Sequence, residues 1–153
     1  MKETLAVINK VLVEVFNNIL TIEQNALREG HFNDISVTEL HTIEAIGMYE
    51  LKSMSEVART LDITVGTLTV AINNLVKKQY VERCRCEKDR RVVKIKLTKK
   101  GKLAFRVHEK FHMDMVKASI LGLTEEEEIV LSKSLLKLND YLKEKYNLSK
   151  GEK

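Results

Sequence analysis

The chain has 153 residues, with 26 lysine and arginine residues against 22 aspartate and glutamate residues and a formal net charge of +4. This length suits one compact domain or one protomer of an intertwined dimer. Charged residues interrupt the first 30 positions, so we expect no signal peptide. No apolar run reaches the length that a membrane span needs, so we expect a cytoplasmic protein.

The positive charge is concentrated in one segment. Residues 77–110 contain 14 lysine and arginine residues against 4 acidic residues, whereas the rest of the chain contains 12 against 18. A basic segment beside an acidic remainder indicates that one end of the molecule binds a polyanion.

Helical periodicity dominates the first third of the chain. A long amphipathic helix is expected over residues 4–26, because apolar residues recur every three or four positions. Its apolar stripe is Leu5, Ile8, Leu12, Phe16, Ile19 and Ile22. Residues 28–33 are expected to form a loop. Ser36 and Glu39 then form a capping box for a helix that ends near Gly47.

Two short helices joined by a tight turn are expected next. Ser53 and Glu56 form a capping box for the first, residues 61–63 form the turn, and Thr64 caps the second. The second helix has an apolar stripe of Val65, Leu68, Ile72, Leu75 and Val76. This arrangement is typical of a helix-turn-helix.

The opposite face of the second helix carries no carboxylate. It consists of Gly66, Thr67, Val70, Asn73, Asn74 and Lys77. Hydroxyl and amide groups can bond base edges, and methyl groups suit the thymine methyl. An ordinary solvated helix would mix glutamate with lysine, so this face favours a helix that reads the major groove of DNA.

A basic two-stranded ribbon is expected after the second helix. Residues 80–87 and 92–97 alternate in character, and a polar turn joins them. An arginine at the tip of such a wing can enter the minor groove, and Asp89 can orient it through a bidentate pair. The alternative is an ordinary solvated hairpin.

The candidate DNA contacts combine this helical face, its cap and the cations of the ribbon. They are Thr64, Gly66, Thr67, Thr69, Val70, Asn73, Asn74, Lys77, Arg83, Arg85, Lys88, Asp89, Arg90 and Arg91. The lysine and arginine residues are expected to contact phosphates, and the helical face to read bases. Because that face holds no arginine, an A·T-rich site is expected.

The cysteines Cys84 and Cys86 lie two apart on the first expected strand. Side chains at this spacing point outward in parallel, which is poor geometry for a mutual disulfide. They are either small strand residues or a redox switch on the wing.

Two further helices are expected at the C-terminal end. Thr98 caps one that reaches about Ile120, and Thr124 with Glu127 caps another that reaches about Tyr146. The terminal helices have apolar stripes too long for a small winged domain to cover, so a second copy of the chain is expected to pack on them. The alternative is a monomer whose terminal helices cover each other.

A short motif, His108-Glu109-Lys110-Phe111-His112, fits the H-E-x-x-H pattern of zinc peptidases. The pattern is short enough to occur by chance, and no third ligand is evident. We therefore expect no enzyme, no cofactor and no metal, with an incidental or regulatory metal site as the alternative.

The segment from Asp89 to Gly101 contains D-x-R followed by L-T-x-x-G, and it resembles the signature of the MarR family of transcriptional regulators. Further segments resemble the repressors of fatty-acid synthesis in Gram-positive bacteria. These segments are 16–20, 34–36, 39–43, 66–69, 73–75 and 111–112, and the similarity runs from about Leu5 to Leu142.

This resemblance implies a mainly α fold, a winged helix-turn-helix with long N- and C-terminal helices that form an intertwined dimer. The single MarR-type domain would cover residues 1–153, with dimerisation helices at 4–27 and 99–146 and the winged helix-turn-helix at 36–98. It implies a transcriptional repressor that binds double-stranded DNA as a homodimer, at a near-palindromic operator.

The resemblance also implies an effector, a long acyl chain carried on acyl carrier protein and acting as corepressor. The candidate pocket residues are Phe16, Leu20, Phe32, Ile35, Leu40, His41, Ile43, His108, Phe111, His112 and Met115. Arg28, Arg106 and Lys110 are candidates for contact with the acidic carrier. Each pocket residue could instead be plain core, and the alternative effectors are a phenolic compound, an oxidant or a metal.

Overall fold

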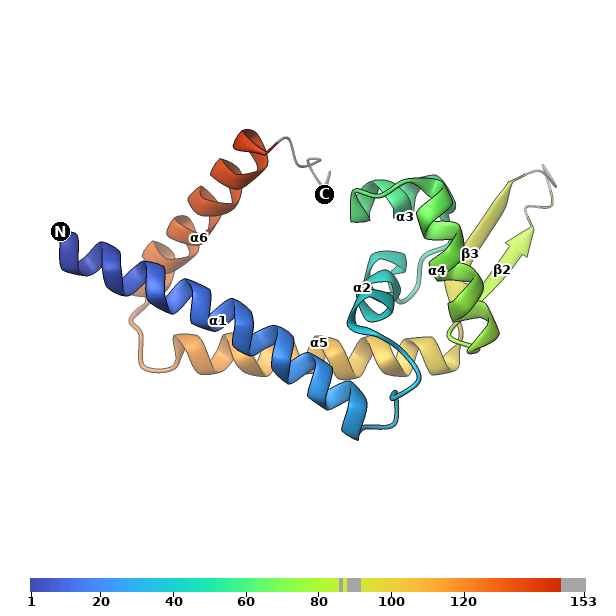
Figure 1. Cartoon of the computed structure of the whole chain (residues 1–153), viewed down its shortest axis with the longest axis horizontal. Coiled ribbons are helices and arrows are strands. Elements are labelled where there is room, and N and C mark those ends of the chain that lie inside the picture. The colour runs from blue at the N-terminus through green and yellow to red at the C-terminus, as the bar shows by residue number, and fades with distance from the viewer. Residues whose placement is uncertain (86, 88–91, 147–153) are drawn as a thin grey trace. The chain divides into compact units, whose positions relative to one another are not determined.

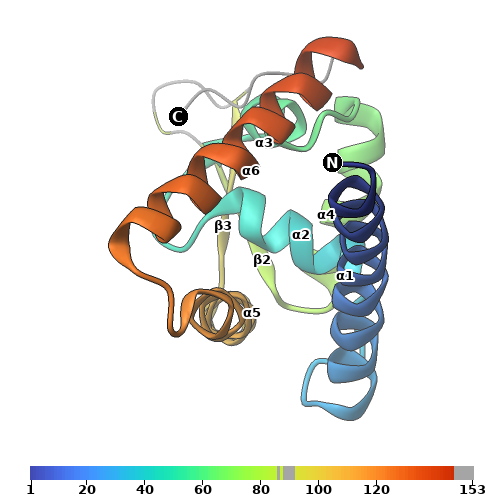
Figure 2. The same cartoon turned by 90° about the vertical axis from the view of Figure 1, so that its left-hand side faces the viewer.

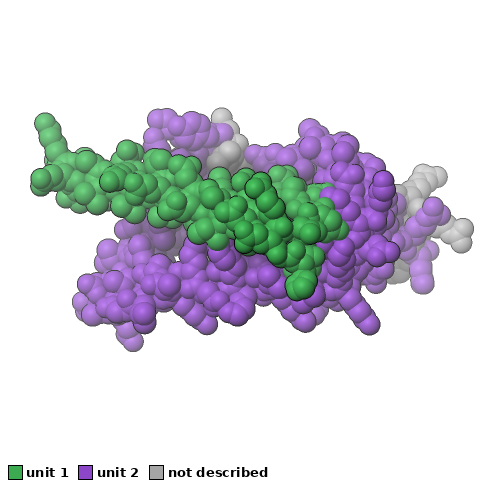
Figure 3. Space-filling view, turned by 60° about the horizontal axis from the view of Figure 1, so that its bottom comes forward, with its two compact units in different colours: residues 1–41 green, residues 42–153 purple. Residues whose placement is uncertain are grey.

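The structure, a computed structural model, describes residues 1–85, 87 and 92–146. Its elements along the chain are α1 (Lys2–Glu29), α2 (Val37–Ile46), β1 (Lys52–Ser53), α3 (Met54–Leu61), α4 (Val65–Lys77), β2 (Val81–Arg85), β3 (Val93–Leu97), α5 (Lys99–Ile120) and α6 (Glu125–Lys145) (Figure 1). The expected mainly helical winged helix-turn-helix fold is confirmed. The chain divides into two compact units, residues 1–41 and residues from 42 onward (Figure 3).

The first unit consists of α1, the segment that follows it and the first half of α2. Leu27, Ile35 and Leu40 are buried, and the Ser36–Glu39 capping box forms as expected, with both reciprocal hydrogen bonds present. Helix α1 continues to Glu29, so residues 28 and 29 are helical and not part of the expected loop. The reason is that residues 26–29 contain no helix breaker before Gly30.

Helix α1 is apolar over most of its length and largely exposed. Val7, Phe16 and Leu20 are among its exposed apolar side chains. By length and composition, Lys2–Glu29 could cross a membrane, which corrects the expectation that no segment is long and apolar enough. One such helix near the N-terminus is weak evidence for a membrane span, because helices that pack against protein pass the same test.

The second unit contains a helix-turn-helix packed on a small antiparallel sheet. Its strand order is β1-β3-β2, with Val81 opposite Leu97 and Arg83 opposite Ile95. Strand β1 was not expected, because two residues are too few to show a periodic pattern. The fully buried core side chains include Ile43, Ile46, Val57, Leu68, Ile72, Leu75, Tyr80 and Ile95.

The helix-turn-helix has the expected boundaries. Ser53 and Glu56 form the capping box of α3, and hydrogen bonds from the Ser53 backbone and hydroxyl lower the pKa of the Glu56 carboxyl. Because that pKa is lowered in the folded protein, the cap's contribution is present at neutral pH and is lost as the pH falls through the lowered value. Asp62 adopts a left-handed conformation, φ 55°, and turns the chain toward Thr64.

The prediction that Val65 of α4 is a core residue is wrong. Val65 is 44% exposed, whereas Leu68, Ile72 and Leu75 are fully buried. Val65 is the first helical residue, and a helical side chain leans toward the N-terminus, so this one lies beyond the edge of the core. At the other end of the stripe, Val76 is only half-buried.

The end of α4 and the start of α5 are joined by a compact set of hydrogen bonds. The amides of Gln79 and Tyr80 donate to the carbonyls of Val76 and Leu75, which closes α4 in a Schellman motif with Gln79 at φ 67°. The Thr98 amide and hydroxyl donate to the Tyr80 carbonyl oxygen, at 3.0 and 3.2 Å, and the same hydroxyl accepts from the Gly101 amide. One threonine therefore caps α5 and fastens it to the end of α4.

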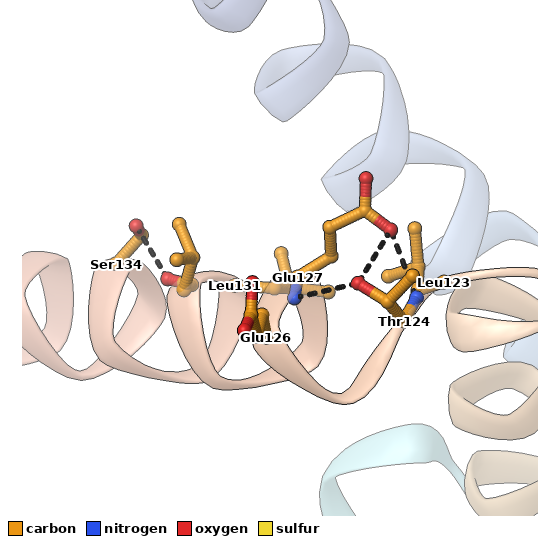
Figure 4. A pocket seen from close by; sticks show the side chains of 7 residues that line it. Leu123, Thr124, Glu126, Glu127, Leu131 and Ser134 are labelled. Atoms are coloured by element: carbon orange, nitrogen blue, oxygen red, sulfur yellow. Dashed lines mark hydrogen bonds between the residues drawn. The ribbon is translucent and has the colours of Figure 1, made fainter.

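Helix α5 begins with buried Gly101, Ala104 and His108, one turn apart on its inner side, and its axis is seen end-on in Figure 2. Helix α6 begins at the expected Thr124–Glu127 capping box, drawn in Figure 4. The backbone and hydroxyl of Thr124 lower the pKa of the Glu127 carboxyl. None of the 21 residues of α6 is buried.

Two glycine substitutions test the contact between α4 and α5. A Cβ at Gly101 would lie 2.1 Å from the Tyr80 carbonyl oxygen, whereas a Cβ at Gly66 would meet only the Thr64 hydroxyl at 3.8 Å. We expect Gly101→Ala to destabilise the fold by about 1–3 kcal/mol because backbone must move. The control Gly66→Ala should be neutral or stabilise by up to about 1 kcal/mol, since alanine favours the helix. Urea unfolding followed by circular dichroism measures both, and equal stabilities would contradict the close approach.

Candidate nucleic-acid interface

The first turn of α4 is organised by Thr64. Its hydroxyl accepts from the Thr67 amide at 3.1 Å and lies 2.9 Å from the Thr67 hydroxyl. Thr69 donates its hydroxyl to the Val65 carbonyl at 2.7 Å, so this hydroxyl is engaged within the helix. The first N–H groups of a helix have no intrahelical acceptor and carry partial positive charge. The capped end of α4 is therefore suited to an anion such as a phosphate.

The predicted reading face of α4 is exposed. Val70 is 62% exposed, and the other members of the face are exposed as well: Gly66, Thr67, Asn73, Asn74 and Lys77. The helix contains no carboxylate along its length. The structure thus brings methyl, hydroxyl and amide groups to one side of the helix, with a cation at its end.

The reading face is tied to the wing by one side-chain pair. Arg83 on β2 donates through Nη2 to the Oδ1 of Asn73 on α4. The sequence predicted that Asn73 reads bases and that Arg83 contacts phosphates. The structure places these two side chains together. An asparagine that reads adenine uses both its oxygen and its NH₂ group. With Oδ1 held by Arg83, Asn73 offers its NH₂ group as a donor instead.

The strands of the wing carry a cross-strand ion pair. Lys96 lies opposite Glu82 in the sheet, and Nζ is 3.1 Å from the carboxylate. This hydrogen bond raises the pKa of Lys96. Arg85 is exposed at the end of β2, and Cys84 is a half-buried free thiol. The candidates Lys88, Asp89, Arg90 and Arg91, together with Cys86, lie outside the described residues.

Some cations of the basic segment serve the fold. Lys100 donates to the Lys78 carbonyl at 3.1 Å, and its Nζ lies 4.1 Å from the centroid of the Tyr80 ring. It neutralises the negative end of α4 and covers the buried tyrosine. Not every lysine and arginine between residues 77 and 110 is therefore available to contact DNA, because Lys100 is engaged within the fold.

The effector candidates are divided between the two units. Phe16, Leu20, Phe32, Ile35, Leu40 and His41 belong to the first, and Ile43, His108, Phe111, His112 and Met115 belong to the second. Ile35, Leu40 and Ile43 are core residues of their units, whereas Phe16 is 62% exposed. In the first unit, Arg28 and Ile35 line a small pocket of about 320 Å³. Of the other carrier-contact candidates, Arg106 is exposed and Lys110 pairs with Asp114.

Two carboxylates that were not among the predicted site residues lie beside candidate histidines. Glu23 is 4% exposed, and its Oε2 lies 3.8 Å from His41 Nε2 in the first unit. Glu44 pairs with His108 in the second unit. The signal for Glu23 was available, because a glutamate that follows Ile19 by four positions interrupts the apolar side of α1. Glu44 had no local signal, since its partner is 64 positions away.

Comparison with known proteins shows which family has this arrangement. The sequence profile described as the MarR family matches residues 33–92. The crystal structure of Streptococcus pneumoniae FabT in complex with DNA is similar to this chain, with 47% identity and a TM-score of 0.82. The similarity covers 90% of this chain and 96% of the FabT chain. The chain belongs to the MarR family.

Other relatives agree on the family and the fold. The HTH-type transcriptional regulator PchR of Bacillus subtilis is 29% identical over 77 residues, which span 50% of this chain and less than half, 46%, of PchR. The S. aureus MepR–DNA complex has a TM-score of 0.68 at 19% identity, over 86% of this chain and 94% of MepR, and supports the fold alone. This MarR family protein is a DNA-binding transcriptional regulator, as its relatives are.

The Asn73–Arg83 pair predicts non-additive effects on DNA binding. Asn73→Ala and Arg83→Ala should each weaken DNA binding. The double variant should bind no more weakly than the single variant with the lower affinity, because the effects of residues that act as a unit are not additive. Arg83→Ala should also reduce the salt dependence, since it removes one cation. Fluorescence anisotropy with a labelled duplex at several salt concentrations measures this.

The matched control is Asn74→Ala, an exposed neighbouring amide on the same helix. Combined with Arg83→Ala, it should give additive losses. Additive losses for Asn73→Ala with Arg83→Ala as well would show that the pair does not act together on DNA.

Proposed function

We propose that this protein represses genes of fatty-acid synthesis by binding a near-palindromic, A/T-rich operator as a homodimer in the cytoplasm. The observation that carries this proposal is the 47% identity to S. pneumoniae FabT over 90% of the chain, a protein whose structure contains DNA. A similarity that covers 90% of the chain is too extensive to be confined to the helix-turn-helix.

In the proposed complex, α4 lies in the major groove. Its exposed groups between Gly66 and Asn74 read bases, and the capped helix end at Thr64 meets a phosphate. Lys77, Arg83, Arg85 and Lys88 contact the backbone. The wing arginines, Arg90 and Arg91, enter the minor groove beside α4, with Asp89 fixing their direction.

The terminal helices supply the proposed dimer interface. The exposed apolar side chains of α1, α5 and α6 include Leu5, Ile8, Val116, Ile129, Leu135 and Tyr141. Around the start of α6, Leu123, Val130 and Leu131 line an open depression of about 640 Å³ (Figure 4). Surfaces this apolar need cover, and a second copy covers equivalent surfaces on both chains. The proposed single domain therefore dimerises through residues 4–27 and 99–146 and binds DNA through residues 36–98.

The proposed corepressor is a long acyl chain on acyl carrier protein. The apolar and aromatic candidates on α1, α2 and α5 would contact the chain, and Arg28, Arg106 and Lys110 would meet the acidic carrier. A ligand tightens DNA binding only if it favours the conformation that binds DNA. An acyl chain bound against α2 and α5 would set the spacing of the two recognition helices.

A new carboxylate on the reading face tests the DNA interface. Val70→Glu should fold normally, because Val70 is 62% exposed. It should lose at least about 2 kcal/mol of binding free energy, roughly thirtyfold in Kd, since it would bring a carboxylate into a groove flanked by phosphates. The measurement is anisotropy with a promoter fragment of a fatty-acid-synthesis operon. The control Tyr49→Glu introduces the same charge at an 80% exposed site off α4 and should bind as the unmodified protein does. Equal affinities for both variants would contradict the proposed reading face.

Acylated carrier protein tests the effector. Long-chain acyl carrier protein should lower the Kd for the operator about 5- to 150-fold, the usual range of coupling between two sites. The carrier protein without an acyl group should have no effect, because the acyl chain makes the differential contact. Titrations of labelled operator in the presence of each carrier form measure this. The same Kd with both forms would exclude this corepressor and leave the DNA interface standing.

A further inference from the structure

Three polar side chains of the second unit converge on α5. His108 and His112 lie one turn apart on this helix, and Glu44 approaches from α2. His108 is 5% exposed, whereas the other two side chains are partly exposed. The Glu44 Oε1 lies 2.7 Å from His108 Nδ1, and the Nε2 atoms of the two histidines are 3.1 Å apart. Phe111 lies against both imidazoles, with ring centroids 6.4 and 5.2 Å away.

The Glu44 carboxylate determines which nitrogen of His108 carries a proton. An ionised carboxylate only accepts hydrogen bonds, so the Nδ1 of His108 donates. A neutral His108 then has its lone pair on Nε2, directed toward His112. Metal-binding histidines commonly have this arrangement, with the second ring nitrogen donating to a carboxylate that fixes the tautomer and orients the ring.

The separation of the two Nε2 atoms matches a shared ion. Two nitrogens that each lie 2.0–2.1 Å from zinc at the tetrahedral angle are about 3.3 Å apart. The observed 3.1 Å is close to this distance. Without an ion, the same approach requires His112 to hold its proton on Nε2 and to donate it to His108. The geometry therefore allows two states, a hydrogen-bonded histidine pair and a metal-bound one.

We propose that the Nε2 atoms of His108 and His112 bind one divalent transition-metal ion of the zinc class, with Glu44 as a positioning residue behind His108. Imidazole nitrogens select zinc, copper, nickel or cobalt over magnesium and calcium, which prefer oxygen. Two protein nitrogens leave coordination positions open to water or another oxygen ligand. The ion links α5 to α2 through the His108–Glu44 hydrogen bond. This inference goes beyond the proposed function and does not depend on it.

Metal titration of the purified full-length protein, stripped with a chelator, tests the site. Isothermal titration with Zn²⁺ should give one ion per chain, and Co²⁺ should develop the visible absorption of a nitrogen-ligated site. His112→Gln should abolish both signals. Glu44→Ala should keep the site but weaken Zn²⁺ binding about 10- to 100-fold, the usual effect of removing the carboxylate behind a histidine ligand. Mg²⁺ should not compete.

The matched control is His31→Gln, which removes an exposed histidine outside the cluster and should bind Zn²⁺ as the unmodified protein does. Circular dichroism of the metal-free proteins identifies any variant that fails to fold. If His112→Gln is misfolded, the Co²⁺ spectrum of the unmodified protein alone tests whether nitrogen ligands bind the ion. Absence of bound Zn²⁺ and of a Co²⁺ spectrum, or equal binding by folded His112→Gln and His31→Gln, would overturn the proposal.

Discussion

The contact between the end of α4 and the start of α5 determines how α4, the proposed recognition helix, is held. Thr98 bonds the carbonyl oxygens of Gln79 and Tyr80, while its hydroxyl caps α5 through the Gly101 amide. Gly101 lets the helix approach the Tyr80 carbonyl so closely that a Cβ would overlap it. These contacts give a physical reason for the L-T-x-x-G part of the family signature. Because these contacts join the two helices, we expect a displacement of α5 to move α4, the proposed recognition helix.

The reading surface depends on the same rigid frame. Leu68, Ile72 and Leu75 hold the inner side of α4 in the core, so its outer side is fixed in orientation. The Arg83–Asn73 hydrogen bond then connects this outer side to β2, and the Glu82–Lys96 pair braces the strands behind it. Helix and wing therefore form one surface, and a change in either alters the groups that the other presents.

The terminal helices contrast with this packed unit. Helix α6 buries none of its residues, and α1 exposes apolar side chains along most of its length. Apolar residues recur every three or four positions in α1, as they do in helices that pack against protein. The proposed second copy would cover these surfaces. His108 and His112, the residues of the proposed metal site, lie on α5, one of the proposed dimerisation helices.

The features that depend on residues three or four positions apart could be predicted from the sequence alone. The Ser53–Glu56, Thr64–Thr67 and Thr124–Glu127 caps were predicted correctly, because helix geometry alone brings these residues together. The carboxylate-free face of α4 was visible for the same reason.

Tertiary structure decided the contacts between distant residues. Asn73 with Arg83, Glu44 with His108, and β1 with β3 have no local pattern, since each pair meets only when helices and strands pack. The exposure of Val65 also depends on tertiary structure. A residue's place in an apolar stripe shows which side of the helix faces inward, but it does not show where the core ends. The periodicity of a sequence shows which side of a helix or strand faces the core. Only the packing of helices and strands determines which residues that side contacts.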